Sequence, residues 1–193
     1  MKVVLLGNTQ VGKTSMLNRL TSGVFKDTAP TIGAAFQTYA VSTNSKCIAM
    51  QIWDTAGQEK YHALAPMYYR SANVAVLCFD LTSYESFSAL ENWVDELADK
   101  GPSNLITVLV GTKSDLVENR AVTSDEAHAL ASSTSMAFYI ECSAKTGEGI
   151  SEIFTKIAQL NDTADEISYR RDPTLKDDSE QSKCCYISFH ILY

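Results

Sequence analysis

The sequence lacks any long apolar run. No stretch of its 193 residues approaches the roughly 20 apolar residues of a membrane-spanning helix, and the opening MKVVLLGN is too short an apolar run for the hydrophobic region of a signal peptide. Positive charge is also scarce, with 16 Lys and Arg against 23 Asp and Glu, a net charge of -7. This balance argues against a protein that blankets nucleic acid or anionic lipid with positive charge. We therefore expect no nucleic-acid partner.

Cysteine is sparse as well. Three of the five cysteines, Cys47, Cys78 and Cys142, lie in apolar or mixed runs, without the paired spacing of a zinc site or the density of a secreted disulfide scaffold. A reduced, cytoplasmic protein is the interpretation that fits. The length and the 45% hydrophobic fraction suit one globular domain with a tail. We expect residues 1–160 to form the domain and the polar residues 161–193 to be disordered.

Short apolar runs recur along the chain and predict strands. Continuous runs rich in β-branched residues are typical of strands covered on both faces, and two further runs separated by turn-like residues predict an antiparallel hairpin at a sheet edge. The buried runs are residues 3–6, 74–79, 105–110 and 137–140, and the hairpin is 35–41 with 47–53. We expect a mostly parallel six-stranded sheet with one antiparallel edge strand.

Helical periodicity fills the segments between these runs. Apolar residues recur at three- and four-residue steps over residues 84–97 and 150–157, and Thr123 with Glu126 forms a candidate capping box for a third helix. Strands that alternate with helices predict a three-layer α/β fold, here with about five helices.

The stretch GNTQVGKT fits the phosphate-binding pattern GxxxxGK[ST] between a predicted strand and a helix that begins near Ser15. Its glycines let backbone N–H groups turn around an anion, its lysine reaches terminal phosphates, and its threonine can ligate magnesium. The alternative is a glycine-containing turn with a surface lysine. The candidate phosphate-binding residues are Gly7, Asn8, Thr9, Gln10, Val11, Gly12, Lys13, Thr14 and Ser15.

A second motif, WDTAGQE at residues 53–59, follows the predicted hairpin. Asp54 at a strand end can hold a magnesium ion through water, Gly57 can offer its N–H to a terminal phosphate, and Gln58 can orient an attacking water. The alternative is a strand followed by an ordinary turn. With the upstream loop counted, we expect Gln58 and Lys13 to be catalytic.

Two further loops predict guanine recognition. In TKSD, residues 112–115, Asp115 can accept the two adjacent donors that guanine presents and adenine does not, while the stem of Lys113 lies against the base. In CSAK, residues 142–145, backbone N–H groups can face the guanine oxygen. Each tetrapeptide alone is common in surface loops, but both follow predicted strands, where open α/β sheets bind ligands. The candidate base-binding residues are Thr112, Lys113, Asp115, Ser143, Ala144 and Lys145.

The four loops together resemble those of small GTPases of the Ras superfamily. TIGAAF at residues 31–36 and WDTAGQEKYHALAPMYYRSA at 53–72 are similar to the Rab family, and most similar to its early-endosomal branch. The resemblance covers residues 2 to about 160. It implies a P-loop G domain that binds GTP or GDP with Mg²⁺, hydrolyses GTP, and acts as a switch in vesicle and endosomal membrane traffic.

The resemblance also implies roles for single residues. Thr31 would close on magnesium and the terminal phosphate beside Thr14 and Asp54, and Phe25 would lie against the guanine. An apolar patch would face effectors, or alternatively its aromatic members would be partial core. The patch comprises Ile32, Phe36, Trp53 and Tyr68.

Partners follow from the same resemblance. They are effector proteins, an exchange factor, a GTPase-activating protein, a GDP-dissociation inhibitor and a prenylation escort. Cys184 and Cys185 resemble twin prenylated cysteines, which would place the protein reversibly on the cytosolic face of an endosomal or vesicle membrane through geranylgeranyl groups. YISFHILY follows them and no farnesyl-type CaaX box is present, so an unmodified cysteine pair is the alternative.

The chain departs from the family pattern at two site positions. Thr112 stands where asparagine is usual, so we expect a bond to the base and a brace to the phosphate loop to be lost or weakened, with weaker nucleotide affinity. Thr9 stands where a small residue is usual, and its β-branched side chain would crowd Gln58 and slow hydrolysis unless it points to solvent. These two positions motivate a second hypothesis, a scaffold that holds GTP persistently. A third, a P-loop nucleotide kinase, is disfavoured because TKSD and SAK specify guanine.

Overall fold

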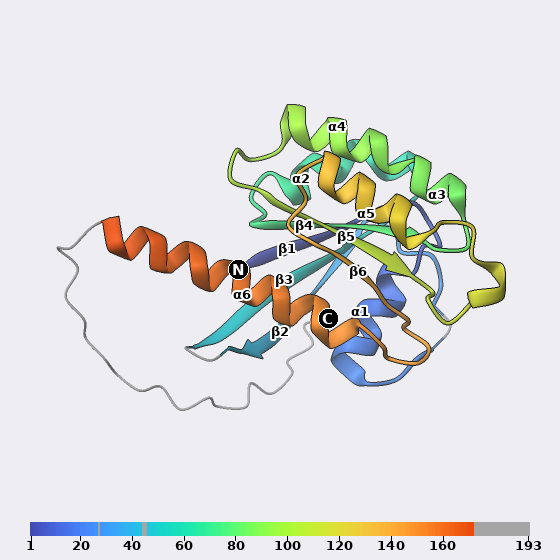
Figure 1. The fold of residues 1–193 in the computed structure, drawn as a ribbon, viewed down its shortest axis with the longest axis horizontal. Helices are drawn as coiled ribbons and strands as arrows, with labels where there is room; N and C mark the ends of the chain where they lie inside the picture. Colours follow the sequence, from blue (N-terminus) through green and yellow to red (C-terminus); the bar gives the residue numbers. More distant parts are fainter. Residues whose placement is uncertain (27, 44–45, 172–193) are drawn as a thin grey trace.

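The computed structural model describes residues 1–26, 28–43 and 46–171 of the chain, with side chains described as far as residue 160. In this part of the chain one sheet of six strands has the order β2-β3-β1-β4-β5-β6 (Figure 1). The strands are β1 Lys2–Leu6, β2 Ala34–Ser42, β3 Cys47–Thr55, β4 Val74–Asp80, β5 Ile106–Thr112 and β6 Tyr139–Glu141. The helices are α1 Lys13–Ser22, α2 Ala65–Tyr69, α3 Tyr84–Ser88, α4 Leu90–Lys100, α5 Ser124–Ser133 and α6 Ile150–Arg171, with 3₁₀ helices η1 Glu59–Leu64 and η2 Val117–Asn119.

The sheet is parallel except at one edge, as the sequence predicted. β1 pairs in parallel with both β3 and β4, and β4, β5 and β6 continue in parallel, whereas β2 pairs antiparallel with β3. Because parallel strands run in the same direction, the carboxyl ends of β1, β3, β4, β5 and β6 lie at one edge of the sheet (Figure 1). All the candidate site loops leave the sheet from this edge.

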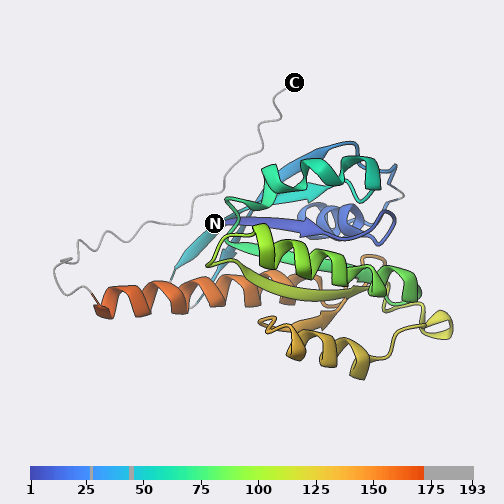
Figure 2. The ribbon, with the colours of Figure 1, turned by 90° about the horizontal axis from the view of Figure 1, so that it is seen from above.

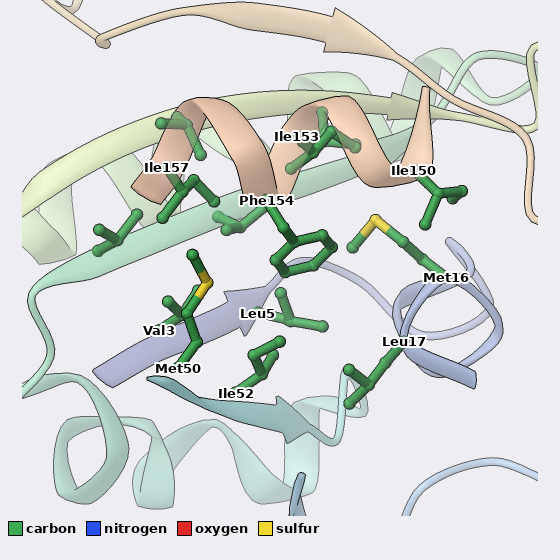
Figure 3. Close-up of a cluster of buried hydrophobic side chains, with 14 of the residues drawn as sticks. Val3, Leu5, Met16, Leu17, Met50, Ile52, Ile150, Ile153, Phe154 and Ile157 are labelled. Atoms are coloured by element: carbon green, nitrogen blue, oxygen red, sulfur yellow. The ribbon is translucent and has the colours of Figure 1, made fainter. Parts of the chain in front are cut away.

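Helices cover both faces of the sheet and give three layers (Figure 2). α1 and α6 enclose one hydrophobic core, in which Phe154 lies between the sheet and the neighbouring helix side chains Met16 and Leu17 (Figure 3). α2, α4 and α5 enclose a second core on the other face, which includes Tyr69, Trp93 and other residues. The apolar residues of β1 and β4 alternate between these two cores, which explains why residues 3–6 and 74–79 form continuous apolar runs.

The helices differ from the prediction in one region. The single helix expected over residues 84–97 is divided into α3 and α4 at Ala89, whose ψ of -12° departs from the α-helical value. Ser83 caps α3, and Ser86 Oγ accepts from Asp80 N at 3.0 Å, so α3 is fixed to the end of β4. If α3 and α4 are counted together, the described residues hold five α-helices, which agrees with the expected number of about five, although α2 was not located from the sequence. The capping box of Thr123 and Glu126 at the start of α5 is confirmed.

The last helix continues past the boundary expected at residue 160. α6 runs to Arg171 and projects beyond the sheet (Figure 1). The sequence offers a reason, since residues 161–171 include good helix formers such as Ala164 and Glu166, and the next proline is Pro173. The rest of the expected tail, with Cys184 and Cys185, lies outside the described residues. Among the described helices, none is both long enough and apolar enough to cross a bilayer.

Replacing Phe154 by alanine should destabilise the domain strongly. Phe154 is fully buried between the sheet and α1, so the Phe154→Ala variant should lose about 3–5 kcal/mol of unfolding free energy because a cavity replaces the ring. Urea unfolding at saturating nucleotide measures this. Phe36→Ala is the matched control, since Phe36 is 57% exposed and should cost less than about 1.5 kcal/mol. Equal losses for the two variants would contradict this description of the core.

Candidate nucleotide site

A cavity of about 520 Å³ opens at the carboxyl edge of the sheet. Its volume is in the range of small-ligand sites. Its walls come from the loops after β1, β3, β5 and β6 and from the segment between α1 and β2. The expected site residues that line it are Thr9, Gln10, Gly12, Lys13, Thr14, Ser15, Phe25, Thr31, Gly57, Thr112, Lys113, Asp115, Ala144 and Lys145. Gly7, Asn8, Val11, Asp54, Gln58 and Ser143 are not part of the lining.

The loop after β1 needs its first glycine for steric reasons. Gly7 has a φ of +135°, and a Cβ atom at this position would lie 2.1 Å from the carbonyl oxygen of Cys78 on β4. Gly12, the N-cap of α1, also has a positive φ of +95°. The loop therefore folds tightly onto the sheet and directs the N-terminus of α1 into the cavity.

Lys13 is a buried cation at the base of this loop. It is 5% exposed, and its Nζ donates to the carbonyl oxygens of Gly7 at 2.6 Å and Asn8 at 2.8 Å. Burial lowers the pKa of Lys13, while the nearby Asp54 carboxylate acts in the opposite direction. The structure thus places a positive group between the loop backbone and the cavity, where an anion would stabilise its charge.

Asp54, Thr14 and Thr31 meet at one side of the cavity although they come from β3, α1 and the segment before β2. Thr14 Oγ1 donates to Asp54 Oδ2 at 2.6 Å, and Thr31 Oγ1 lies 2.8 Å from Thr14 Oγ1 and 3.3 Å from Asp54 Oδ2. The sequence had predicted these three residues as one group. The segment that carries Thr31 is therefore joined to the phosphate loop and to the end of β3.

The oxygen atoms of this cluster fit the magnesium ion that the family resemblance implies. Hydroxyl and carboxylate oxygens are the ligands that Mg²⁺ takes from proteins, together with phosphate and water. Asp54 is 2% exposed, and its Oδ1 is buried without a hydrogen-bond partner among the described residues. Burial raises the pKa of Asp54, and the Thr14 hydrogen bond and the Lys13 charge oppose this shift. A cation at this position would compensate the buried carboxylate oxygen.

The loop after β3 lies directly against the phosphate loop. A Cβ atom at Gly57 would come within 2.4 Å of the backbone nitrogen of Thr9 and closer still to the backbone of Asn8, so only glycine allows this approach. Thr9 itself is exposed and lines the cavity. Gln58 follows at the start of η1, where its carbonyl accepts from Tyr61 N. Gln58 is therefore next to the cavity but does not line it.

The loops after β5 and β6 are joined at the other end of the cavity. Asp115 Oδ1 accepts from Ser143 Oγ at 2.6 Å, and Lys145 Nζ lies 4.0 Å from Asp115 Oδ2. Ser143 is fully buried, and its Oγ also accepts from Thr146 N at 3.1 Å. Ser143 thus orients the Asp115 carboxylate, which faces the cavity as expected for a residue that accepts donors from a base.

Thr112 retains the brace that its substitution for asparagine was expected to weaken. Its Oγ1 lies 2.5 Å from the carbonyl oxygen of Val11 in the phosphate loop and 2.9 Å from that of Phe79 on β4. The brace that was expected to be lost or weakened is therefore present, because a short side chain reaches this buried carbonyl as well. Its weakening relative to asparagine stays a prediction. A hydroxyl has one proton, and here it faces two carbonyl groups. Whether a bond to the base is weaker stays a prediction.

Two features of the site were missed from the sequence, the partner of Lys113 and one wall of the cavity. Lys113, with a φ of +62°, places its Nζ 2.6 Å from Asp80 Oδ2, so Asp80 at the end of β4 holds the lysine that was expected to cover the base. The position of Asp80 after an apolar run could have placed it at this edge of the sheet, although not opposite Lys113. The segment between Phe25 and Thr31 was also missed as a wall, and its lining residues are Lys26, Thr28, Ala29 and Pro30.

Three of the four expected effector-facing residues form a connected aromatic group, and the fourth is an exposed aliphatic residue. Ile32 is 80% exposed, and the Phe36 ring stacks on Trp53 with centroids 5.3 Å apart. The ring centroids of Trp53 and Tyr68 are 5.7 Å apart. Both rings are partly buried and pack against the second hydrophobic core. Each of the two interpretations applies to part of this aromatic group. Phe36 is exposed, as a residue that faces effectors would be, whereas Trp53 and Tyr68 belong partly to the core.

The comparisons with known proteins agree with this geometry. The model of the family described as "Ras family" matches residues 2–163. The chain therefore belongs to the Ras family, whose members are small GTPases that bind guanine nucleotides and work with regulators and effectors. It is 41% identical over 189 residues to Ras-related protein Rab5 of Nicotiana tabacum. The aligned residues make up 95% of this chain and 94% of the relative. This similarity supports the expected Rab character of the GTPase.

Removing the Thr112 hydroxyl should loosen the phosphate loop. Thr112→Val keeps the shape of the side chain but leaves the carbonyl groups of Val11 and Phe79 without this donor, which should cost about 1–3 kcal/mol of unfolding free energy and speed GDP release. Thr112→Ser keeps the hydroxyl and is the matched control. Denaturant unfolding and release of a fluorescent GDP measure both effects. A valine variant that behaves like the serine variant would show that the brace contributes nothing.

Proposed function

We propose that the chain is a guanine-nucleotide switch in endosomal and vesicle membrane traffic, with its nucleotide held in the cavity described above. The observation that carries this proposal is the meeting of Thr14, Thr31 and Asp54, which links three separate segments. It lies beside a buried carboxylate oxygen that has no hydrogen-bond partner in the part of the chain that the structure describes. In this arrangement the phosphates lie against Lys13 and the N-terminus of α1, and the base lies near Asp115. The relative's name, Ras-related protein Rab5, supports the assignment to the endosomal branch.

Hydrolysis in this site depends mainly on positioning and charge. Gln58 orients a water molecule, whose oxygen attacks the terminal phosphorus of GTP. The bond to the oxygen that bridges the second and third phosphates breaks, and GDP and inorganic phosphate leave. Lys13 stabilises the charge on the phosphate oxygens, and Mg²⁺ held by Thr14, Thr31 and Asp54 supplies further charge neutralisation when bound. Gln58 follows Gly57 next to the cavity, and an activating protein completes its placement, so that turnover without this protein is slow.

The terminal phosphate also controls the surface that partners contact. Thr31 and Gly57 belong to the two segments nearest the phosphate loop, and loss of the phosphate releases both. The exposed Ile32 follows Thr31 directly, and the exposed Phe36 lies near the start of β2. Effectors therefore bind the surface formed by Ile32, Phe36, Trp53 and Tyr68 in the GTP state. An exchange factor, an activating protein and a GDP-dissociation inhibitor recognise the segments that carry Thr31 and Gly57.

Membrane attachment is a separate part of the proposal. Geranylgeranyl groups on Cys184 and Cys185, added with a prenylation escort, would hold the protein on the cytosolic face of an endosomal or vesicle membrane. Both cysteines lie outside the described residues, so this stays a prediction from the sequence. The unmodified cysteine pair remains its alternative.

Guanine selectivity tests the proposed nucleotide site. GTP and GDP should displace a fluorescent GDP at micromolar concentrations or below, whereas ATP should fail at millimolar concentrations because its base offers no adjacent donors to Asp115. Asp115→Ala should lower the affinity for GDP by at least about tenfold, and the exposed Asp125→Ala on α5 should not change it. Displacement by ATP as effective as that by GTP would refute the site and favour the nucleotide-kinase alternative.

Chelation of magnesium tests the oxygen cluster. Excess EDTA should speed GDP release from the wild-type protein by about tenfold or more, because the cation binds the nucleotide-bound state. Asp54→Asn should release GDP rapidly even with magnesium present and should respond little to EDTA, whereas the exposed Asp99→Asn on α4 should behave like wild type. Equal sensitivity of the wild type and Asp54→Asn to EDTA would mean that Asp54 has no part in a cation site.

A second candidate function, a scaffold that holds GTP persistently, is favoured by the position of Thr9. Its backbone lies against Gly57, beside the residue proposed to orient water. Thr9→Gly should raise the single-turnover rate of GTP hydrolysis, by about tenfold if the side chain crowds Gln58. Val11→Ala, at a buried position of the same loop, controls for general loosening. Unchanged hydrolysis in Thr9→Gly would exclude crowding, and measurable turnover stimulated by an activating protein would reject the scaffold.

A further inference from the structure

Arg19 of α1 joins the two loops that flank the base end of the cavity. Its Nη1 donates to the carbonyl oxygen of Gly23 at 2.7 Å, and its Nη2 donates to that of Thr146 at 3.1 Å. Gly23 and Thr146 are far apart in the sequence, and the loop that precedes α6 passes beside α1 (Figure 1). A guanidinium has its donors in a fixed planar fork, so one side chain holds both carbonyl groups in a defined relative position.

The first of these contacts fixes the segment that carries Phe25. Gly23 ends α1 in the left-handed conformation, with its N–H bonded to the carbonyl oxygen of Arg19 at 3.0 Å. The Arg19 side chain adds a bond to the carbonyl oxygen of the same residue. Val24 and Phe25 follow immediately, and both are exposed large hydrophobic residues. Phe25 lines the cavity, so its position there depends on how firmly Gly23 is held.

The second contact fixes the loop after β6. Thr146 directly follows Ala144 and Lys145, which line the cavity, and Thr146 N donates to the Ser143 hydroxyl that orients Asp115. The fit is close at the next residue, since a Cβ atom at Gly147 would lie 2.8 Å from Arg19 Nη2. The loop is thus shaped around the guanidinium.

We infer that Arg19 is a positioning residue for the nucleotide base: by bonding both carbonyl groups it clamps the Phe25 segment to the loop that orients Asp115, and so slows nucleotide release. It does so without lining the cavity. The inference rests on the proposed guanine-nucleotide site and adds a residue to it. It concerns the rate at which bound nucleotide leaves, since the clamp must loosen for one wall to move away from the other.

Release of a fluorescent GDP from the full chain in the presence of magnesium tests the clamp. Arg19→Gln removes the charged fork and should speed release by about tenfold, and Arg19→Lys, which keeps the charge but can reach one carbonyl group at a time, should speed it by about threefold. Lys100→Gln, at the exposed end of α4, removes one positive charge elsewhere and should leave the rate unchanged.

A double variant separates positioning from a general loss of stability. If Arg19 acts through the Phe25 segment, then Arg19→Gln should speed release less than about threefold in a Phe25→Ala background, because the wall it positions is already truncated. A fully additive effect in the double variant would overturn the inference. The inference would also be overturned if Arg19→Gln lowered the melting temperature at saturating GDP but left the release rate of GDP unchanged. That result would mean that Arg19 stabilises the fold without controlling nucleotide release. If the wild-type protein does not retain GDP, the proposed nucleotide site itself is wrong. If the wild type retains GDP and Arg19→Gln releases it at the same rate, only the inference about Arg19 is wrong.

Discussion

The carboxylate of Asp54 is the constraint on which the site depends. It is buried at the end of β3, and one of its oxygens binds the hydroxyls of Thr14 and Thr31 while the other has no partner among the described residues. Burying a charged oxygen without compensation is unfavourable, so this position favours a cation and, through it, a phosphate. The same contacts tie the start of α1, the segment before β2 and the end of β3 to one point.

The sheet makes this convergence possible. Parallel pairing of β1 with β3 and β4 brings residues that are distant in sequence to a single edge, and the two cores on either face keep the strands in register. Buried groups hold both ends of the cavity, Lys13 in the glycine loop and Thr112 at the start of TKSD. The walls contributed by Phe25, Lys26 and Ala29 are exposed instead. A rigid floor beneath exposed walls suits a protein that must hold a nucleotide tightly and still exchange it.

Much of this could be predicted from the sequence, because the signals were local. Apolar runs predicted the strands, and the glycine loop and TKSD indicated the two ends of the cavity. What could not be predicted depends on distances through space. The Lys113–Asp80 pair, the bond from Thr112 to Val11 and the contact of Gly57 with the phosphate loop each join segments that leave no shared pattern in the sequence. The division at Ala89 and the short helices η1 and α2 were missed because five or six residues are too few to show a period.

Hydrogen exchange of the backbone amides tests most directly whether the third phosphate orders the segments that meet at Asp54. The full chain would be compared with bound GDP and with a non-hydrolysable GTP analogue, both with magnesium present. The account predicts slower exchange with the analogue over residues 28–36 and 56–64, while β4 and β5 exchange equally slowly in both states. Identical exchange over all these segments in the two states would contradict it.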